Sequence, residues 1–341
     1  MKGLKNETVE KVKAGKDVTF EELKPLFRPS GVQNGEMKVD PDKCTGCGLC
    51  RENCPFKCWE VGENKIARLK DGYACFSCSN CVVACPVNAI SIISTYAVEG
   101  GYYDTGYPPV KMPKEPKDAK GKPVEWNEVE QAIMTRRSVR NFKDKPVPET
   151  LISRILEAGR FAASAGNMQP WKFAIVTDKK FIAELEEVAY NINAGLYNLY
   201  INDDTAVQAF SIVGGVLPQA VFDYRVMIGG FRSVVGRELP CFLNAPCVIF
   251  LGSNDKMVGP DLHTGISGQN MNLTAHSLGL GCCWSNFGGV INNVPELKAK
   301  LGFDDEWRIV TTICVGYPKF NQVGIAARML RPVTWIRSGS D

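Results

Sequence analysis

Apolar residues from about position 125 onward follow two different periods. Spacings of three and four residues predict an amphipathic helix with one apolar face made by Leu151, Ile155, Ala158 and Ala162. Short apolar runs predict buried strands at 172–176, 247–251 and 309–315. Between the last two strands, a second helical pattern extends from about 262 to 278. This alternation indicates a domain of the α+β or α/β class.

The pattern before residue 125 is different. Thr19 and Glu22 have the spacing of a capping box, and three apolar residues follow at helical intervals. Apolar segments at 60–61 and 66–68 flank a polar turn and predict a small hairpin. Residues 100–122 are rich in Pro, Gly and Lys, which is typical of a linker. The chain therefore divides into a helical leader (1–36), a small domain (37–99), a linker (100–125) and a larger domain (126–341).

Length and charge fit a cytoplasmic protein of about two domains. The 341 residues carry a net charge of only +3, and no sustained basic face favours nucleic acid. The longest apolar stretches are shorter than the roughly 20 residues that cross a bilayer. Residues 1–20 are polar and Lys-rich, unlike a signal peptide. We expect neither a nucleic acid nor a membrane as partner.

Two cysteine runs share one spacing, and a proline follows each: Cys44-x2-Cys47-x2-Cys50-x3-Cys54 and Cys75-x2-Cys78-x2-Cys81-x3-Cys85. Such short intervals let three thiolates converge on one iron–sulfur cubane. Disulfide frameworks suit small secreted domains. Zinc sites favour two Cys-x2-Cys pairs separated by a longer loop. Both alternatives therefore fit less well, and the segment at about 39–93 resembles a bacterial two-cluster ferredoxin.

The ferredoxin resemblance implies two [4Fe-4S] clusters, each taking its fourth ligand from the other run. One cluster is expected on Cys44, Cys47, Cys50 and Cys85. The other is expected on Cys75, Cys78, Cys81 and Cys54. The remaining cysteines are expected to be small buried apolar residues: Cys58, Cys241, Cys247, Cys282, Cys283 and Cys314.

Two segments of the larger domain carry further candidate chemistry. Residues 136–142 read RRSVRNF, and clustered guanidiniums beside a hydroxyl suit a phosphate monoester. By itself this run is equally typical of a solvated helix end. Residues 167–171 read NMQPW, and the later segments GLGCCW at 279–284 and GYP at 316–318 follow in order. Taken together, residues 127–332 resemble the nitroreductase family of FMN enzymes.

The nitroreductase resemblance implies an α+β fold with a central antiparallel or mixed sheet and flanking helices. It places the FMN phosphate between Arg328 or Arg331 on one side and the 136–140 run on the other, namely Arg136, Arg137, Ser138 and Arg140. Near the flavin ring and ribityl chain it places Asn167 and Gln169. Backbone donors toward the flavin N5 and O4 edge would come from Trp284, Ser285 and Asn286.

The resemblance also implies a variable lid over the substrate pocket at about 190–243. Aromatic residues with an arginine could bind a planar or carboxylated substrate there. The candidate contacts are Tyr197, Tyr200, Phe222, Tyr224 and Arg225. An aromatic-rich lid or dimer contact is the plainer alternative for each of them. No catalytic residue is assigned, and neither His263 nor His276 has a paired ligand pattern.

The two resemblances together predict an iron–sulfur flavoprotein oxidoreductase. Electrons would pass from reduced ferredoxin or a similar low-potential donor through two clusters to FMN. A small organic acceptor, such as a nitroaromatic, a quinone or an activated alkene, would then be reduced. The alternatives are a flavin dehydrogenase with the clusters as electron exit, and a non-catalytic electron-transfer or redox-sensing module. The family resemblance further predicts a homodimer with FMN at the subunit interface.

Overall fold

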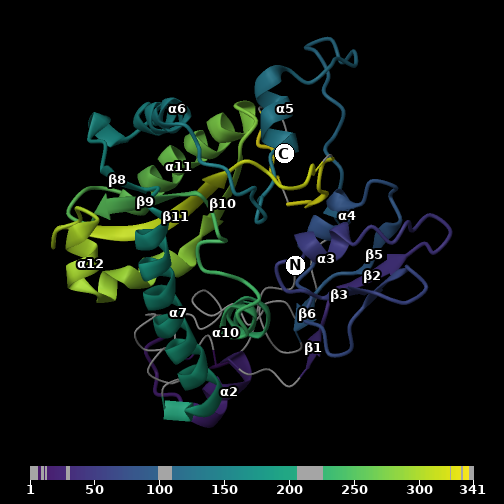
Figure 1. The fold of residues 1–341 in the computed structure, drawn as a ribbon, viewed down its shortest axis with the longest axis horizontal. Coiled ribbons are helices and arrows are strands. Elements are labelled where there is room, and N and C mark those ends of the chain that lie inside the picture. The colour runs from purple at the N-terminus through teal and green to yellow at the C-terminus, as the bar shows by residue number, and fades with distance from the viewer. Residues whose placement is uncertain are drawn as a thin grey trace.

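The computed structural model describes residues 7–8, 11, 14–27, 31–98, 110–205, 226–322, 324–331 and 333–337. Two parts are visible in Figure 1. The larger part is built around a central sheet, and the smaller part, from the N-terminal third of the chain, lies beside one edge of that sheet.

The central sheet has four antiparallel strands in the order β10-β11-β9-β8. Its strands are β8 (Trp171–Val176), β9 (Cys247–Asn254), β10 (Gly281–Ser285) and β11 (Trp307–Gly316). Every residue of β9 is buried, as expected for a strand covered on both faces. The strands predicted at 172–176, 247–251 and 309–315 are confirmed, although β9 extends three residues further.

Alternate residues of β9 face two separate cores. Ile249 and Leu251 pack with Ile155 and Met271, which belong to α6 (Glu149–Arg160) and α11 (Pro260–Ser277). Figure 1 shows both helices on the same side of the sheet. Gly159 permits their close approach, because a Cβ at this position would collide with the Met271 side chain.

The other face of the sheet is covered by a different set of helices. Phe250 of β9 packs with Leu185 of α7 (Lys179–Asn202) and Leu297 of α12 (Pro295–Lys300). Two short segments complete this side: a π-helical turn, η2 (Val226–Phe231), and α10 (Arg232–Val235). Helix α5 (Glu128–Thr135) leads into the 136–140 run and starts with an Asn127–Glu130 capping box. The predicted α+β class is confirmed.

The smaller part contains three two-stranded ladders and two short helices. β2 (Glu36–Val39) pairs with β5 (Ile90–Ser94), and β1 (Val32–Gln33) pairs with β6 (Ala97–Val98). The predicted hairpin is confirmed as β3 (Trp59–Val61) and β4 (Ala67–Leu69). Helices α3 (Leu49–Asn53) and α4 (Asn80–Ala84) each carry the third cysteine of a run.

The predicted leader and the predicted linker also contain regular elements. The predicted capping box precedes α2 (Phe20–Phe27), where the Thr19 backbone N–H donates to Glu22 Oε2 at 2.8 Å. Within the predicted linker, β7 (Val110–Lys111) pairs with β12 (Arg328–Met329) near the C-terminus. No helix in the described part of the chain has the length and apolar character needed to span a bilayer.

Candidate functional site

The eight cysteines of the two runs form two groups. Cys44, Cys47, Cys50 and Cys85 line one small cavity between α3 and the loop before β5. Cys47 is exposed, whereas Cys50 is buried and its pKa is raised to about 11, mainly by burial. This group is the set predicted to bind one of the two clusters.

The second group lies deeper. Burial raises the pKa of Cys81 well above its usual value, and the nearby charges of Cys78, Cys54 and Cys75 raise it further. Thiolates this close repel one another, so an adjacent cation such as cluster iron is needed to hold all four deprotonated. The exchange of fourth cysteines between the runs stays a prediction that both groupings support.

The backbone explains how such short runs can converge. Gly46 and Gly48 in the first run, and Ser77 and Ser79 in the second, have φ between 62° and 74°. These left-handed positions turn the chain tightly. Backbone N–H groups also donate to sulfurs of the predicted ligands, from Ser77 to Cys75 Sγ at 3.4 Å and from Ala89 to Cys85 Sγ at 3.2 Å. Such donors favour thiolate ligands of a cluster.

The alternatives of disulfides and zinc receive no support from this geometry. All fourteen cysteines are unpaired. A zinc site would require three or four side chains converging on one ion. Within the described ranges, no three His, Cys, Asp or Glu side chains are close enough to bind a single ion.

The 136–140 run is fixed against the edge strand β10. Arg136 ends α5 with its backbone N–H donating to Ala132 at 3.1 Å. Ser138 then forms a parallel bridge with Cys282, and the Val139 backbone N–H donates to the Cys282 carbonyl at 3.0 Å. The run is therefore attached to the sheet edge at Ser138 and Val139.

Arg137 is the buried member of this run, with 7% of its surface exposed. Its Nε and Nη1 atoms have no hydrogen-bond partner among the described residues. The pKa of Arg137 is lowered to about 10, first by burial and then by the charges of Arg328, Arg136 and Arg140. A buried, charged and unpartnered guanidinium is costly. The donor set therefore fits an anion such as the FMN phosphate.

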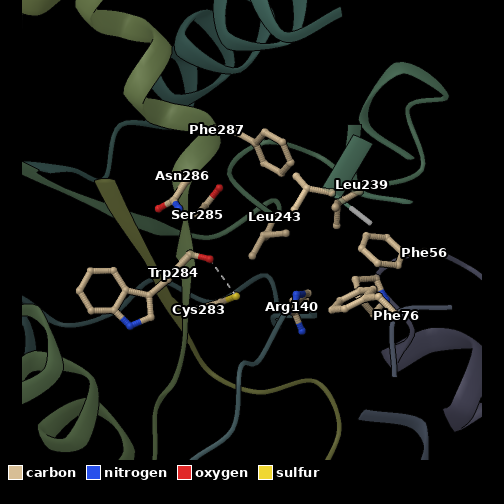
Figure 2. A pocket seen from close by; sticks show the side chains of 13 residues that line it. Phe56, Phe76, Arg140, Leu239, Leu243, Cys283, Trp284, Ser285, Asn286 and Phe287 are labelled. Atoms are coloured by element: carbon tan, nitrogen blue, oxygen red, sulfur yellow. Dashed lines mark hydrogen bonds between the residues drawn. The ribbon is translucent and has the colours of Figure 1, made fainter. Parts of the chain in front are cut away.

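A cavity of about 290 Å³ lies between the two parts of the chain. Figure 2 shows that Arg140 and the segment 283–287 border it on one side. The Trp284 indole points away and packs on Gly268 of α11, and Ser285 Oγ donates to the Cys241 carbonyl at 2.6 Å. The Trp284 and Ser285 side chains therefore make other contacts, and the backbone donors at 284–286 stay a prediction.

Other predicted site residues lie elsewhere. Asn167 and Gln169 are exposed at the start of β8, the opposite edge of the sheet from β10, and both have left-handed φ values of 56° and 50°. In contrast, Arg328 in β12 lies close enough to Arg137 for its charge to lower the Arg137 pKa, and Arg331 is exposed just beyond β12. One chain therefore does not bring the 167–169 segment together with the 136–140 run.

The predicted substrate contacts are only partly described. Tyr200 on α7 is 1% exposed, and Tyr197 on the same helix is half-buried. Neither lines the 290 Å³ cavity. Phe222, Tyr224 and Arg225 lie outside the described residues. Their roles as substrate contacts stay predictions.

Sequence reasoning missed part of the cavity lining. Pro55, Phe56 and Phe76 of the smaller part border the cavity, and Figure 2 shows Phe56 and Phe76 on the side opposite to Cys283 and Trp284. Leu239, Leu243 and Phe287 complete the apolar lining. The sequence does hold a clue to these two aromatic residues. Phe56 and Phe76 each follow a predicted cluster ligand closely, and a domain this small has little core in which to bury an aromatic ring.

Comparisons with known proteins match two separate segments of the chain. A family model described as the nitroreductase family matches residues 133–317, and one described as a 4Fe-4S dicluster domain matches residues 43–90. A putative NADH dehydrogenase/NAD(P)H nitroreductase of Methanothermobacter thermautotrophicus is 26% identical over 194 residues, covering 57% of this chain and 79% of that protein. A 4-nitrobenzoate reductase of Pseudomonas putida is 28% identical over 208 residues, covering 58% and 89%.

A similar solved structure is a nitroreductase with bound FMN from Desulfitobacterium hafniense. It is 21% identical with a TM-score of 0.47, and the match covers 62% of this chain and 100% of that one. The nitroreductase match itself spans more than half of the present chain. The chain therefore belongs to the nitroreductase family of oxidoreductases and carries an N-terminal 4Fe-4S dicluster domain.

Proposed function

We propose that this protein passes electrons through two [4Fe-4S] clusters to FMN and on to a small organic acceptor. One observation carries the proposal. The loops that follow predicted cluster ligands Cys54 and Cys75 border the same cavity as Arg140 and the 283–287 segment of the nitroreductase domain. A cavity shared in this way would put electron donor and acceptor sites next to each other.

The residues expected to hold FMN fit an anionic cofactor. Arg137 offers two unpartnered buried nitrogen atoms, and Arg136, Arg140 and Arg328 add to the positive potential around it. When bound, FMN would accept single electrons or donate a hydride, whereas each cluster would carry one electron. The chain's own contribution is to bind the phosphate, orient the ring by main-chain donors and shield the cavity.

We further propose a homodimer with FMN at the subunit interface. Its support is the position of Asn167 and Gln169, which are exposed at the sheet edge opposite to the 136–140 run. If both segments contact FMN, the second segment has to come from another copy of the chain. Gel filtration combined with flavin analysis tests this, because a monomer that retains full FMN would contradict it.

Reduced ferredoxin, or a carrier of similar potential, is the proposed electron donor. Its support is the dicluster domain, with Cys47 exposed at the surface. The names of the archaeal and bacterial relatives point to NAD(P)H for those proteins. Anaerobic reduction by NADH, NADPH and reduced ferredoxin separates the two. Reduction of the flavin by ferredoxin supports the proposal, and rapid bleaching by a nicotinamide alone would contradict it.

A non-catalytic electron-transfer role is less well supported, because the cavity at the domain boundary has the size and apolar lining of a small-molecule site. Reduced protein should therefore turn over a nitroaromatic, a quinone or an activated alkene. Rapid electron transfer to a protein partner without turnover of any of these acceptors would favour the relay instead.

A further inference from the structure

We propose that the ferredoxin-like domain also selects the acceptor, because Phe56 and Phe76 form an aromatic wall that binds a planar aromatic acceptor with an anionic substituent. This inference rests on the proposed function, since the bound flavin is taken to lie by Arg140 and the 283–287 segment. It assigns to the dicluster domain a role in specificity in addition to electron transfer.

The two rings form one contact surface. Their centroids are 4.2 Å apart and their planes are inclined by 53°. Phe56 lies two residues after Cys54, and Phe76 directly follows Cys75, so both rings are carried by loops of the second cysteine group. Figure 2 shows the pair facing the cavity from the side opposite to Cys283 and Trp284.

The η2 turn of the larger domain packs against the Phe56 ring. A Cβ added to Gly229 in η2 would lie 2.8 Å from ring atoms of Phe56, and one on Gly230 would lie 3.6 Å away. Only glycine allows η2 to approach the ring this closely. The η2 turn is itself packed, since Phe231 meets Phe287 edge to face at 5.4 Å. The aromatic wall is therefore held by both domains, as a selective site requires.

The lining of the cavity defines the chemistry of the ligand. Leu239 and Leu243 make the lining apolar, and Arg140 provides the charged group among the lining residues. A carboxylate directed at Arg140 would complete the recognition.

Two ligands of equal charge and similar size test the wall: benzoate, which is planar and aromatic, and cyclohexanecarboxylate, which is neither. Both are titrated into the oxidised holoenzyme by calorimetry, with flavin and iron contents measured on the same sample. We expect the wild type to prefer benzoate by about tenfold, the free energy typical of aromatic contacts. Phe56→Leu and Phe76→Leu should each lose most of this preference. Phe56→Tyr, which keeps the ring, should retain it.

Phe181→Leu is the matched control, because Phe181 is also partly buried but packs at the start of α7, away from the cavity. It should leave the preference unchanged. Equal affinity of the wild type for both ligands, or a preference that survives both Leu variants with full cofactor content, would overturn this inference alone. A wild-type protein without FMN or iron would instead overturn the proposed function on which it rests.

Discussion

The Asn141 side chain donates from Nδ2 to the main-chain carbonyl of Glu52 at 2.8 Å. This bond joins the residue after the 136–140 run to α3, two residues before Cys54. A second bond, from Gln322 Nε2 to Asn53 Oδ1 at 2.6 Å, crosses the same boundary. Adjacent residues of α3 are thus held by two separate segments of the nitroreductase domain.

Replacing Asn141 by Ala should weaken the docking of the two domains. The Glu52 carbonyl is part-buried and would lose its partner, which typically costs about 1–3 kcal/mol. Denaturant unfolding of the holoenzyme should show a loss in this range. Gln131→Ala is the control, because its bond to the Trp126 carbonyl stays within the nitroreductase domain and is exposed. Equal small losses in both variants would show that the Asn141 bond does not hold the domains together.

Gly229→Ala should displace the Phe56 ring, because the new methyl group would lie 2.8 Å from it. We expect weaker binding of benzoate with FMN and iron contents unchanged. The comparison is Gly195→Ala on α7, where the added methyl group meets nothing within 4 Å and helix propensity improves by about 1 kcal/mol. If G229A binds benzoate as tightly as G195A does, the ring is not fixed by η2.

Replacing Arg137 by Leu should have opposite effects on the FMN-free and FMN-bound protein. Without FMN, the variant removes an unpartnered buried charge and should be more stable by about 1 kcal/mol or more. With FMN, it loses a charge-assisted hydrogen bond of about 1.5–3 kcal/mol, so FMN affinity should fall at least about tenfold. Thermal unfolding of both forms and flavin fluorescence measure these changes.

The control for Arg137 is Arg68→Leu, which removes an exposed guanidinium paired with Glu60 at 2.7 Å on the β3–β4 hairpin. Such surface pairs contribute about 0–1 kcal/mol, so neither quantity should change much. An R137L protein that is less stable without FMN, yet binds FMN normally, would contradict the assignment of Arg137 to the phosphate.

The exchange of fourth cysteines predicts which variants should look alike. Cys85→Ala should alter the same cluster as Cys47→Ala, whereas Cys54→Ala should alter the same cluster as Cys81→Ala. Electron paramagnetic resonance of the reduced proteins, with iron analysis, compares the pairs. The control is Cys247→Ala. Because Cys247 lies in β9, outside both cysteine runs, this variant should keep all its iron. Similar spectra for C85A and C81A would show that each run binds its own cluster.

Much of the fold was accessible from the sequence because local patterns were strong. Strand β9 and most of β11 are buried on both faces of the sheet, so their apolar runs are nearly continuous. The helix start after Thr19 follows from capping chemistry. The cysteine groups are close in sequence and their spacing restricts their geometry.

The acceptor cavity could not be predicted in the same way, because it is made by contacts between distant segments. Phe56 and Phe76 meet Arg140 and Phe287 only after the two domains dock. No periodic pattern encodes such a contact. Likewise, Asn167 and Gln169 were grouped with Arg136 by resemblance, although one chain holds these residues at opposite edges of the sheet.

The central claim is that the dicluster domain delivers electrons to the flavin of the same protein. The most direct test is anaerobic mixing of reduced ferredoxin with the wild type and with a Cys75→Ala/Cys78→Ala variant that retains FMN, followed at the flavin absorbance band. We predict rapid bleaching in the wild type and an oxidised flavin in the variant. Equal bleaching rates in the two proteins would contradict the claim.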